Sequence, residues 1–207
     1  MDSICLFGAS GHGKVIKEII ESQENKVVAF IDDAPKNEKL AGISVFKTAD
    51  IQQFLSEKFV ISIGNNLIRK KISKAYALKY AKAIHSQAVI SKTAAILEGT
   101  VIMAGAILNA DSSIGKHCIV NTNAVIEHDC MIADYVHISP NATITGNVNI
   151  GEGTHIGAAA VVLPNIKIGT WATVGAGTVV LKDIPDFAIV AGNPGKIINY
   201  KEKENEH

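Results

Sequence analysis

Hydrophobic residues recur with two different periods along this chain. Within residues 1–80, short apolar runs alternate with segments whose apolar residues repeat every three or four positions. We predict strands at ICLFGA, KVVAFIDD, ISVFK and FVISIG, and helices at KVIKEIIESQ, TADIQQFLSE and NNLIRKKISKAYALKY, with Thr48 capping the second helix. Strands that alternate with helices favour a small parallel sheet, so residues 1–80 are predicted to be a Rossmann-like α/β domain.

The period becomes six from Ile84 onward. Every sixth residue from Ile84 to Val180 is Ile, Leu or Val, without an insertion, and the residue two positions earlier is small or β-branched. Alternate residues of a strand point to the same side, so both positions are predicted to face inward. A six-residue repeat of this kind indicates a parallel β-helix, in which three hexads form a coil of about 18 residues. Residues 81–207 are therefore predicted to be a β-helix domain with a C-terminal cap after Pro185.

The charge balance and the cysteines exclude several classes of function. Lys+Arg and Asp+Glu are both 20, so the net charge is zero and gives no basic patch for nucleic acid. No apolar run reaches the roughly 18 residues of a membrane span, and no basic region precedes the first apolar run as in a signal peptide. Cys5, Cys118 and Cys130 stand in no metal-ligand or redox spacing, so we expect reduced core thiols in a cytoplasmic protein.

A glycine-rich turn follows the first predicted strand. Gly8, Gly11 and Gly13 have the spacing G-x-x-G-x-G, which differs from the dinucleotide fingerprint. Such a turn leaves backbone N–H groups free at a helix N-terminus, where phosphate binds well. Asp32 and Asp33 end the second strand, where a carboxylate can accept hydrogen bonds from a ribose or a base. The alternative is a tight turn that serves only packing.

One histidine stands at a corner of the hexad frame with space beside it. His128 lies between Glu127 and Asp129, and the residues 18 positions away in the neighbouring coils are Ala110 and Gly146. Because both are small, we predict that His128 projects into open space, which a catalytic residue needs for its substrates. Our hypothesis is that His128 serves as a general base. An imidazole with a pKa of about 6.5 suits that role near neutral pH. The spacing does not decide which flanking acid supports it.

Two further pairs of residues are also 18 apart. Ala158 and Ala176 are predicted to stack at another corner and to leave a smooth channel, whereas His137 and His155 are predicted to stack in adjacent coils, with His155 as an exposed corner residue. The gaps between His117, His128, His137 and His155 are 11, 9 and 18 residues, which fit no metal-ligand pattern, so no metal is expected.

The segments GASGHGKV, FIDD, SIGNNLIRKKI and NAVIEHDC, together with uninterrupted hexads closed by VAGNPGK, resemble a known family. They look like the hexapeptide-repeat sugar acetyltransferases of the UDP-N-acetylbacillosamine type, whose relatives include sialic acid O-acetyltransferase-like proteins. The resemblance implies a left-handed β-helix, a homotrimer, and acetyl-CoA bound in grooves between subunits. It also implies acetyl transfer to the 4-amino group of a UDP-linked 4-amino-4,6-dideoxy sugar.

The resemblance assigns roles to particular residues. It implies that Ser10, Gly11 and His12 contact the UDP portion and that Asp32 and Asp33 contact the uridine. Gly64, Asn65 and Asn66 are weaker candidates, because they end the fourth predicted strand at the carboxyl edge where such sheets bind ligands.

For the acetyl transfer, the resemblance implies His128 as the base, supported by the following residue. That residue is often Glu in the family, whereas this chain has Asp129, with Glu127 as the alternative. The same resemblance implies that His137 contacts the thioester region of acetyl-CoA and that the coenzyme lies in a channel such as the one predicted at Ala158 and Ala176. Gly146 is a further candidate on the coenzyme side, with backbone amides near it as oxyanion donors. Two other functions stay open: O-acetylation of sialic acid or another polysaccharide precursor, and a non-catalytic nucleotide-binding trimer.

Overall fold

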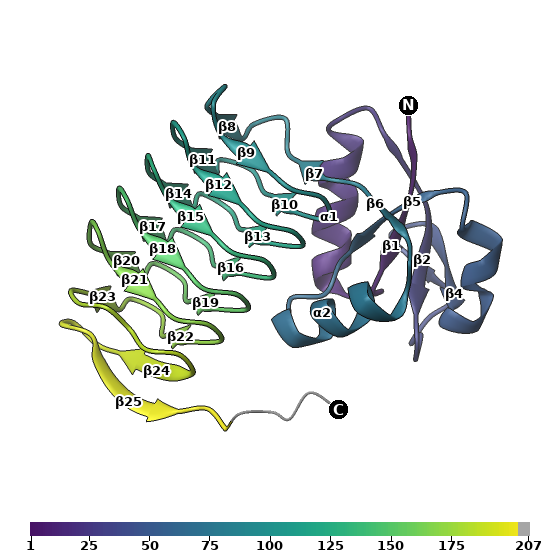
Figure 1. Ribbon diagram of the computed structural model, residues 1–207. Helices are drawn as coiled ribbons and strands as arrows, with labels where there is room; N and C mark the ends of the chain where they lie inside the picture. Colours follow the sequence, from purple (N-terminus) through teal and green to yellow (C-terminus); the bar gives the residue numbers. More distant parts are fainter. Residues whose placement is uncertain (203–207) are drawn as a thin grey trace.

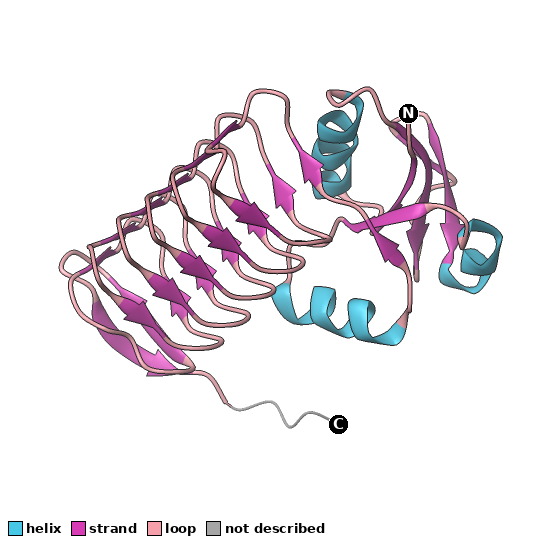
Figure 2. Cartoon of the chain, turned by 45° about the horizontal axis from the view of Figure 1, so that its top comes forward, coloured by secondary structure: helices cyan, strands magenta, loops and turns pink. Residues whose placement is uncertain are grey.

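The structure is a computed structural model that describes residues 1–202 and contains an N-terminal α/β unit joined to a β-helix (Figures 1 and 2). The α/β unit contains, in chain order, β1 (Ser3–Phe7), α1 (Gly11–Glu21), β2 (Lys26–Asp32), β3 (Lys39–Leu40), β4 (Ile43–Lys47), a 3₁₀ helix (Thr48–Phe54), β5 (Lys58–Ile61), α2 (Asn66–Ala75) and β6 (Lys79–Tyr80). The predicted Rossmann-like arrangement is confirmed.

The strands of the α/β unit form a sheet in the order β3-β4-β2-β1-β5-β6. Strand β1 pairs in parallel with β2 on one side and with β5 on the other, and β3 pairs antiparallel with β4. After β1 the chain adds β2 and β4 on one side of β1, and it then returns to add β5 on the other side, so the strand order switches between β1 and β5. In such sheets a ligand binds outside the carboxyl ends of the strands at this switch point.

Two local predictions in this unit are wrong. The helix predicted at NNLIRKKISKAYALKY ends at Ala75, and Lys79–Tyr80 form strand β6. The segment TADIQQF forms a 3₁₀ helix whose N-cap residue is Lys47, so Thr48 does not cap it. Instead, the Thr48 hydroxyl donates a hydrogen bond to the Asp33 carboxylate. The Thr48 hydroxyl, which the sequence pattern assigned to the start of the helix, therefore bonds to Asp33 just after β2.

Apart from the longer strands β24 and β25 at its C-terminal end, the β-helix is built from two-residue strands on three faces. Face 1 contains β7 (Ala83–Ile84), β10 (Val101–Ile102), β13 (Ile119–Val120), β16 (His137–Ile138), β19 (His155–Ile156), β22 (Thr173–Val174), β24 (Ala188–Ala191) and β25 (Lys196–Tyr200). Face 2 contains β8 (Val89–Ile90), β11 (Ile107–Leu108), β14 (Val125–Ile126), β17 (Thr143–Ile144), β20 (Val161–Val162) and β23 (Val179–Val180). Face 3 contains β9 (Ala95–Ile96), β12 (Ser113–Ile114), β15 (Met131–Ile132), β18 (Asn149–Ile150) and β21 (Lys167–Ile168).

The coils stack in the register that the hexads predict. Val101 pairs with Ala83 and with Ile119, and the same parallel 18-residue step repeats along the helix, which is left-handed. At the C-terminal end β24 pairs in parallel with β22, and β25 then returns antiparallel along β24. These two strands occupy the place of the expected cap.

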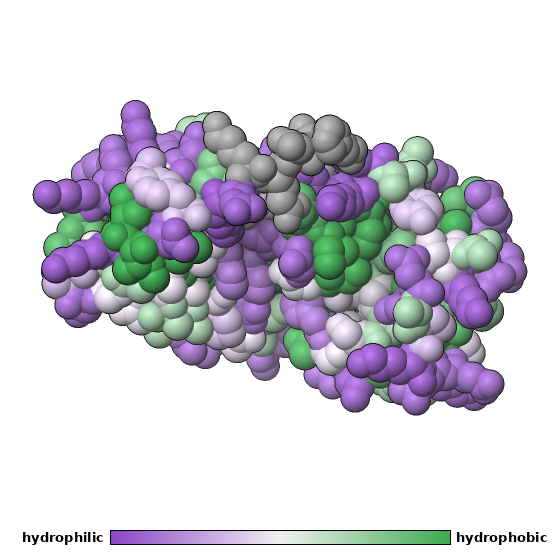
Figure 3. Space-filling view, turned by 90° about the horizontal axis from the view of Figure 1, so that it is seen from below, coloured by the Kyte–Doolittle hydropathy of each residue, from purple (hydrophilic) through white to green (hydrophobic). Residues whose placement is uncertain are grey.

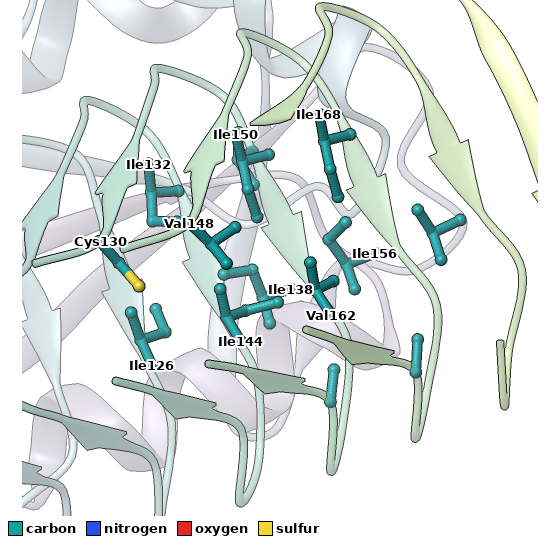
Figure 4. Packing of buried hydrophobic residues seen from close by; sticks show 14 of the residues in the cluster. Ile126, Cys130, Ile132, Ile138, Ile144, Val148, Ile150, Ile156, Val162 and Ile168 are labelled. Carbon is teal, nitrogen blue, oxygen red and sulfur yellow. The ribbon is translucent and has the colours of Figure 1, made fainter. Parts of the chain in front are cut away.

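The core of the β-helix consists of the two inward positions of each hexad (Figure 4). Ile126, Ile144 and Val162 are fully buried in successive coils. Cys118 and Cys130 fill the small inward position and are free and buried, which confirms their role in packing. Burial raises the pKa of the Cys118 thiol to about 12, so it is inert as a nucleophile.

The α/β unit covers the first coils of face 1. The outward residues Ala83, Val101 and Ile119 are almost fully buried because they pack against residues such as Ile4 and Ile16. In the next two strands the same outward position holds His137 and His155. The change from apolar to polar residues marks the point on face 1 where the packing contact ends.

Candidate functional site

The turn between β14 and β15 carries His128 at the corner of faces 2 and 3. Its Nδ1 atom lies 2.7 Å from Oδ2 of Asp129, and 60% of the His128 side chain is exposed. The hydrogen bond to Asp129 raises the pKa of His128, and the charge of Glu127 adds a smaller effect in the same direction. Of the two flanking acids, Asp129 is the one in hydrogen-bond contact with the imidazole.

The backbone at this corner explains the contact. Asp129 has φ of 61°, in the left-handed region that Asp and Asn tolerate better than most residues. In the next coil Gly146 lies directly beside the ring, because a Cβ built there would stand 2.7 Å from both Cε1 and Nε2 of His128. The predicted space beside His128 is therefore present only because residue 146 has no side chain.

The loops after β1 and β5 lie side by side at the switch point. A Cβ added to Gly11 or to Gly64 would meet no atom within 4 Å, so open space lies above both residues. Ser10 is the N-cap residue of α1, but its side chain makes no capping hydrogen bond. The first N–H groups of this helix are therefore available to a ligand. Asn65 instead caps α2, since its side chain accepts a hydrogen bond from the amide of Ile68.

The two aspartates at the end of β2 already have partners within the protein. Asp32 accepts hydrogen bonds from the amides of Ala9, at 2.8 Å, and Ala34, at 3.0 Å, so it fixes the glycine turn. Asp33 accepts the hydroxyl of Thr48. The structure thus gives both carboxylates a role in shaping this edge of the sheet.

Neutral histidines lie where the glycine turn approaches face 1. Burial lowers the pKa of His12 to about 4 and that of His137 to about 3. Nε2 of His12 is buried and has no hydrogen-bond partner in residues 1–202. His137 contacts Gly64, with Nδ1 3.4 Å from the carbonyl oxygen, and Asn121, whose amide nitrogen is 3.1 Å from Nε2.

His155 differs from its prediction. It lies on β19, not at a corner, and is only partly exposed, with its ring stacked on His137 at 4.9 Å between centroids. Its Nε2 atom is 2.8 Å from the hydroxyl oxygen of Ser139. The predicted stacking with His137 is confirmed. The prediction of an exposed corner residue is wrong because His155 is a strand residue whose ring packs against His137 and bonds the Ser139 hydroxyl.

A single chain does not bring all the candidate residues together. His128, Asp129 and Gly146 share the corner of faces 2 and 3, whereas Ala158 and Ala176 lie exposed in consecutive turns at the corner of faces 1 and 2. The glycine turn, the loop at Gly64 and His137 form a third group on face 1. Seen from below, the middle of the surface between the two units is mainly hydrophilic (Figure 3).

Comparison with known proteins identifies both parts of the chain. Residues 3–76 match the family described as the PglD N-terminal domain, and residues 111–146 and 147–182 match the bacterial transferase hexapeptide repeats. A UDP-N-acetylbacillosamine N-acetyltransferase from Bacillus subtilis (strain 168) is 42% identical over 103 residues, which cover 44% of this chain. The match spans about half of that protein, 47% of its length.

Two solved structures resemble the whole chain. A mutant of perosamine N-acetyltransferase from Caulobacter crescentus, in complex with CoA and GDP-perosamine, is 32% identical with a TM-score of 0.92, over 96% of this chain and 98% of that chain. The chain belongs to the hexapeptide-repeat sugar N-acetyltransferases. The acetyltransferase domain of PglB from Neisseria gonorrhoeae FA1090, in complex with acetyl coenzyme A, is 35% identical with a TM-score of 0.88, over 95% and 98% of the two chains.

In this acetyltransferase, the sequence reasoning missed Arg69. Its side chain is 1% exposed and lies between α2 and the corner of faces 1 and 3. The missed signal is the spacing i, i+3, i+4, i+7 of four polar residues on the predicted helix, which is the spacing of one helix face. These four residues are Asn66, Arg69, Lys70 and Ser73, and all contact the β-helix.

Residues 1–202 of this acetyltransferase contain neither a metal-binding cluster nor a membrane-spanning helix. No group of three or more His, Cys, Asp and Glu side chains is placed to hold a metal ion. Within the same residues, no helix is long and apolar enough to cross a membrane.

Proposed function

We propose that this protein transfers the acetyl group of acetyl-CoA to the 4-amino group of a UDP-linked 4-amino-4,6-dideoxy sugar. The observation that carries this proposal is the His128–Asp129 pair set over Gly146 on a hexapeptide β-helix. The structures with CoA, acetyl coenzyme A and GDP-perosamine support the two substrate classes. The nucleotide is inferred to be UDP from the GASGHGKV and FIDD segments and from the Bacillus relative.

His128 acts as the general base. Asp129 holds the proton on Nδ1, which leaves the lone pair of Nε2 free to accept a proton from the sugar amine. The amine nitrogen attacks the thioester carbonyl, the C–N bond forms, the C–S bond breaks, and His128 passes the proton to the leaving thiolate. Base catalysis of this kind is worth roughly 10²–10⁴-fold in rate. The Gly146 amide donates to no acceptor in residues 1–202, so it is free to bind the oxyanion.

The nucleotide binds at the switch point of the α/β sheet. Its diphosphate lies at the N-terminus of α1, beside the open faces of Gly11 and Gly64. Nε2 of His12 gains its missing partner from the ligand, and an unmade hydrogen bond of this kind costs about 1–3 kcal/mol. Asp32 contributes by holding the turn.

A homotrimer completes the site. His128 and His137 belong to one coil, β14 to β16, but project from a corner and from a different face. Rotation about a threefold axis parallel to the β-helix keeps residues at the same height. Packing of the corner of one copy against face 1 of the next then brings His128 to the glycine turn, the Gly64 loop and His137 of that copy. Ala158 and Ala176 then supply the smooth channel for the pantetheine arm between subunits.

The substrate class is tested with a panel of acceptors. UDP-, GDP- and dTDP-linked 4-amino-4,6-dideoxy sugars and free sialic acid are incubated with acetyl-CoA, and free thiol and acetylated product are measured. We expect the UDP-linked amino sugar to give the highest kcat/KM. Preference for sialic acid would favour the O-acetyltransferase, and no thiol release with any acceptor would favour a non-catalytic nucleotide-binding trimer.

The shared site is tested by mixing variants. His128→Ala and His12→Ala are each expected to lose turnover of the nucleotide sugar, while His128→Ala keeps its affinity for acetyl-CoA. If one site uses residues of two copies, unfolding and refolding the two variants together restores activity in mixed trimers. Two inactive variants that stay inactive after co-refolding, while sedimentation shows mixed trimers, would contradict a site shared in this way.

A further inference from the structure

Arg69 of α2 is a buried cation whose hydrogen bonds are all made. Its guanidinium offers five N–H donors. The five acceptors belong to three parts of the chain: the loop after β5, through the carbonyls of Ile63 (3.1 Å) and Gly64 (2.9 Å); the first residue of α2, through Oδ1 of Asn66 (2.9 Å); and two turns of the β-helix, through the carbonyls of His117 (3.0 Å) and Tyr135 (2.9 Å).

None of these acceptors is a carboxylate, so the charge of Arg69 is solvated only by neutral oxygens. Burial lowers the pKa of the guanidinium to about 10, but it stays charged at neutral pH. A buried ion is expensive to desolvate, and an apolar side chain of similar size often stabilises a fold as well or better. Stability alone therefore does not account for an arginine here.

The hydrogen bonds of Arg69 to the loop also affect the surroundings of His137. The Gly64 carbonyl that accepts from Arg69 is also the one that faces Nδ1 of His137. Arg69 thus ties the switch-point loop to two coils of the β-helix and sets where that loop stands relative to His137. The guanidinium also lies close enough to lower the pKa of His12, His137 and His155.

We propose that Arg69 is a positioning residue that holds the loop Ile63–Asn65 in the geometry required to bind the nucleotide sugar. The role in binding rests on the function proposed above; the role in holding the loop does not. Some other polar residues of α2 contact the β-helix but not the loop Ile63–Asn65. Lys70, for instance, pairs with Glu152 at 2.6 Å and lies over the ring of Trp171 at 5.3 Å.

The test compares Arg69→Lys with Lys70→Met. The first keeps the charge but loses the planar fork, whereas the second removes a contact between the same helix and the β-helix. Amide hydrogen exchange is measured by mass spectrometry in peptides that cover residues 60–69, without ligand. These peptides include the amide of Ser62, which donates to the Phe7 carbonyl, and the amides of Ile68 and Arg69, which donate to Asn65 at the end of the loop. We expect exchange there to become at least about tenfold faster in Arg69→Lys, which corresponds to about 1.4 kcal/mol of lost protection, and to be unchanged in Lys70→Met.

The kinetic arm separates positioning from general stability. In Arg69→Lys we expect the KM for the nucleotide sugar to rise about tenfold, while the KM for acetyl-CoA stays close to wild type. Equal loop exchange in both variants would overturn the proposal. A wild-type protein that acetylates no nucleotide sugar would overturn the proposed function, and the exchange result would still decide whether Arg69 holds the loop.

A measurement on the wild-type protein covers the case in which Arg69→Lys does not fold. With all five donors engaged, the Nε and Nη protons of Arg69 are expected to give separate, slowly exchanging NMR signals. Free arginine in the same buffer provides the reference for a guanidinium that rotates and exchanges without restraint. Signals of Arg69 that average and exchange as fast as those of free arginine would refute its role as a fixed anchor.

Discussion

The substitution Gly146→Ala tests the geometry of the corner site. The added Cβ would lie 2.7 Å from Cε1 and Nε2 of His128 and 3.3 Å from Nδ1. Carbon atoms in contact are normally about 3.5–4.0 Å apart, so the ring has to move by roughly 1 Å. Because the ring is 60% exposed, it can swing outward at little cost in stability, but Nε2 then leaves its position. A misplacement of about 1 Å costs on the order of 10²-fold in rate.

The assay is thiol release at saturating acetyl-CoA and amino sugar, with thermal unfolding as the check of folding. Alanine keeps the backbone N–H of residue 146, so the loss reports on the position of the ring and leaves the proposed oxyanion donor in place. We expect kcat to fall about 100-fold in the wild-type background and not to fall further in a His128→Ala background. Turnover within about twofold of wild type, or an equal loss in both backgrounds, would refute the reasoning.

Three further predictions concern charge, pH and metals. In Asp129→Asn the pKa of His128 is expected to fall, because the hydrogen bond that raises it is lost. The acid limb of the pH profile of kcat/KM then moves to lower pH, and the plateau value drops on the order of 10²-fold. An acid limb that does not move would contradict the assignment of Asp129. Burial lowers the pKa of His117 from 6.5 to about 4, so the unfolded chain takes up this proton first as the pH falls. The free energy of unfolding measured with urea is therefore expected to be about 2 kcal/mol lower at pH 5 than at pH 7 because of this histidine. The substitution His117→Gln is expected to remove that part of the pH dependence. Because residues 1–202 hold no cluster suited to a metal ion, prolonged EDTA treatment is expected to leave turnover unchanged; activity that is lost and then restored by zinc would contradict this.

The β-helix is predictable from the sequence because its core is one-dimensional. Each hexad contributes the same two inward positions, so Ile126 or Cys130 can be placed without knowing any distant contact. The space beside His128 follows from the same counting, since Gly146 stands one coil away. The α/β unit is also predictable in outline, as strand and helix periods differ clearly within residues 1–80.

Contacts between the two units are not predictable in this way. Arg69 finds its acceptors at His117 and Tyr135, which are 48 and 66 residues away, and no local pattern encodes that distance. The carboxylates of Asp32 and Asp33 bind the glycine turn and Thr48, whereas their place at a strand end had indicated only a ligand.

The left-handed turn position of the hexads has a consequence for recognising attached domains. This position is occupied by Asn or Asp at several turns, such as Asp111, Asn123 and Asn147, which fits their tolerance of positive φ. At the corner that faces α2 it holds His117, Tyr135 and Trp171, with φ of 52°, 60° and 55°. A bulky residue in this conformation costs about 1–2 kcal/mol. Contacts with α2, such as the hydrogen bond between the Tyr135 and Ser73 hydroxyls, offset this cost. His117, Tyr135 and Trp171 stand at multiples of 18 in one column, with Gly153 in the coil between Tyr135 and Trp171. Bulky residues at this turn position thus mark the place where α2 packs on the β-helix, over three coil steps or about 14 Å.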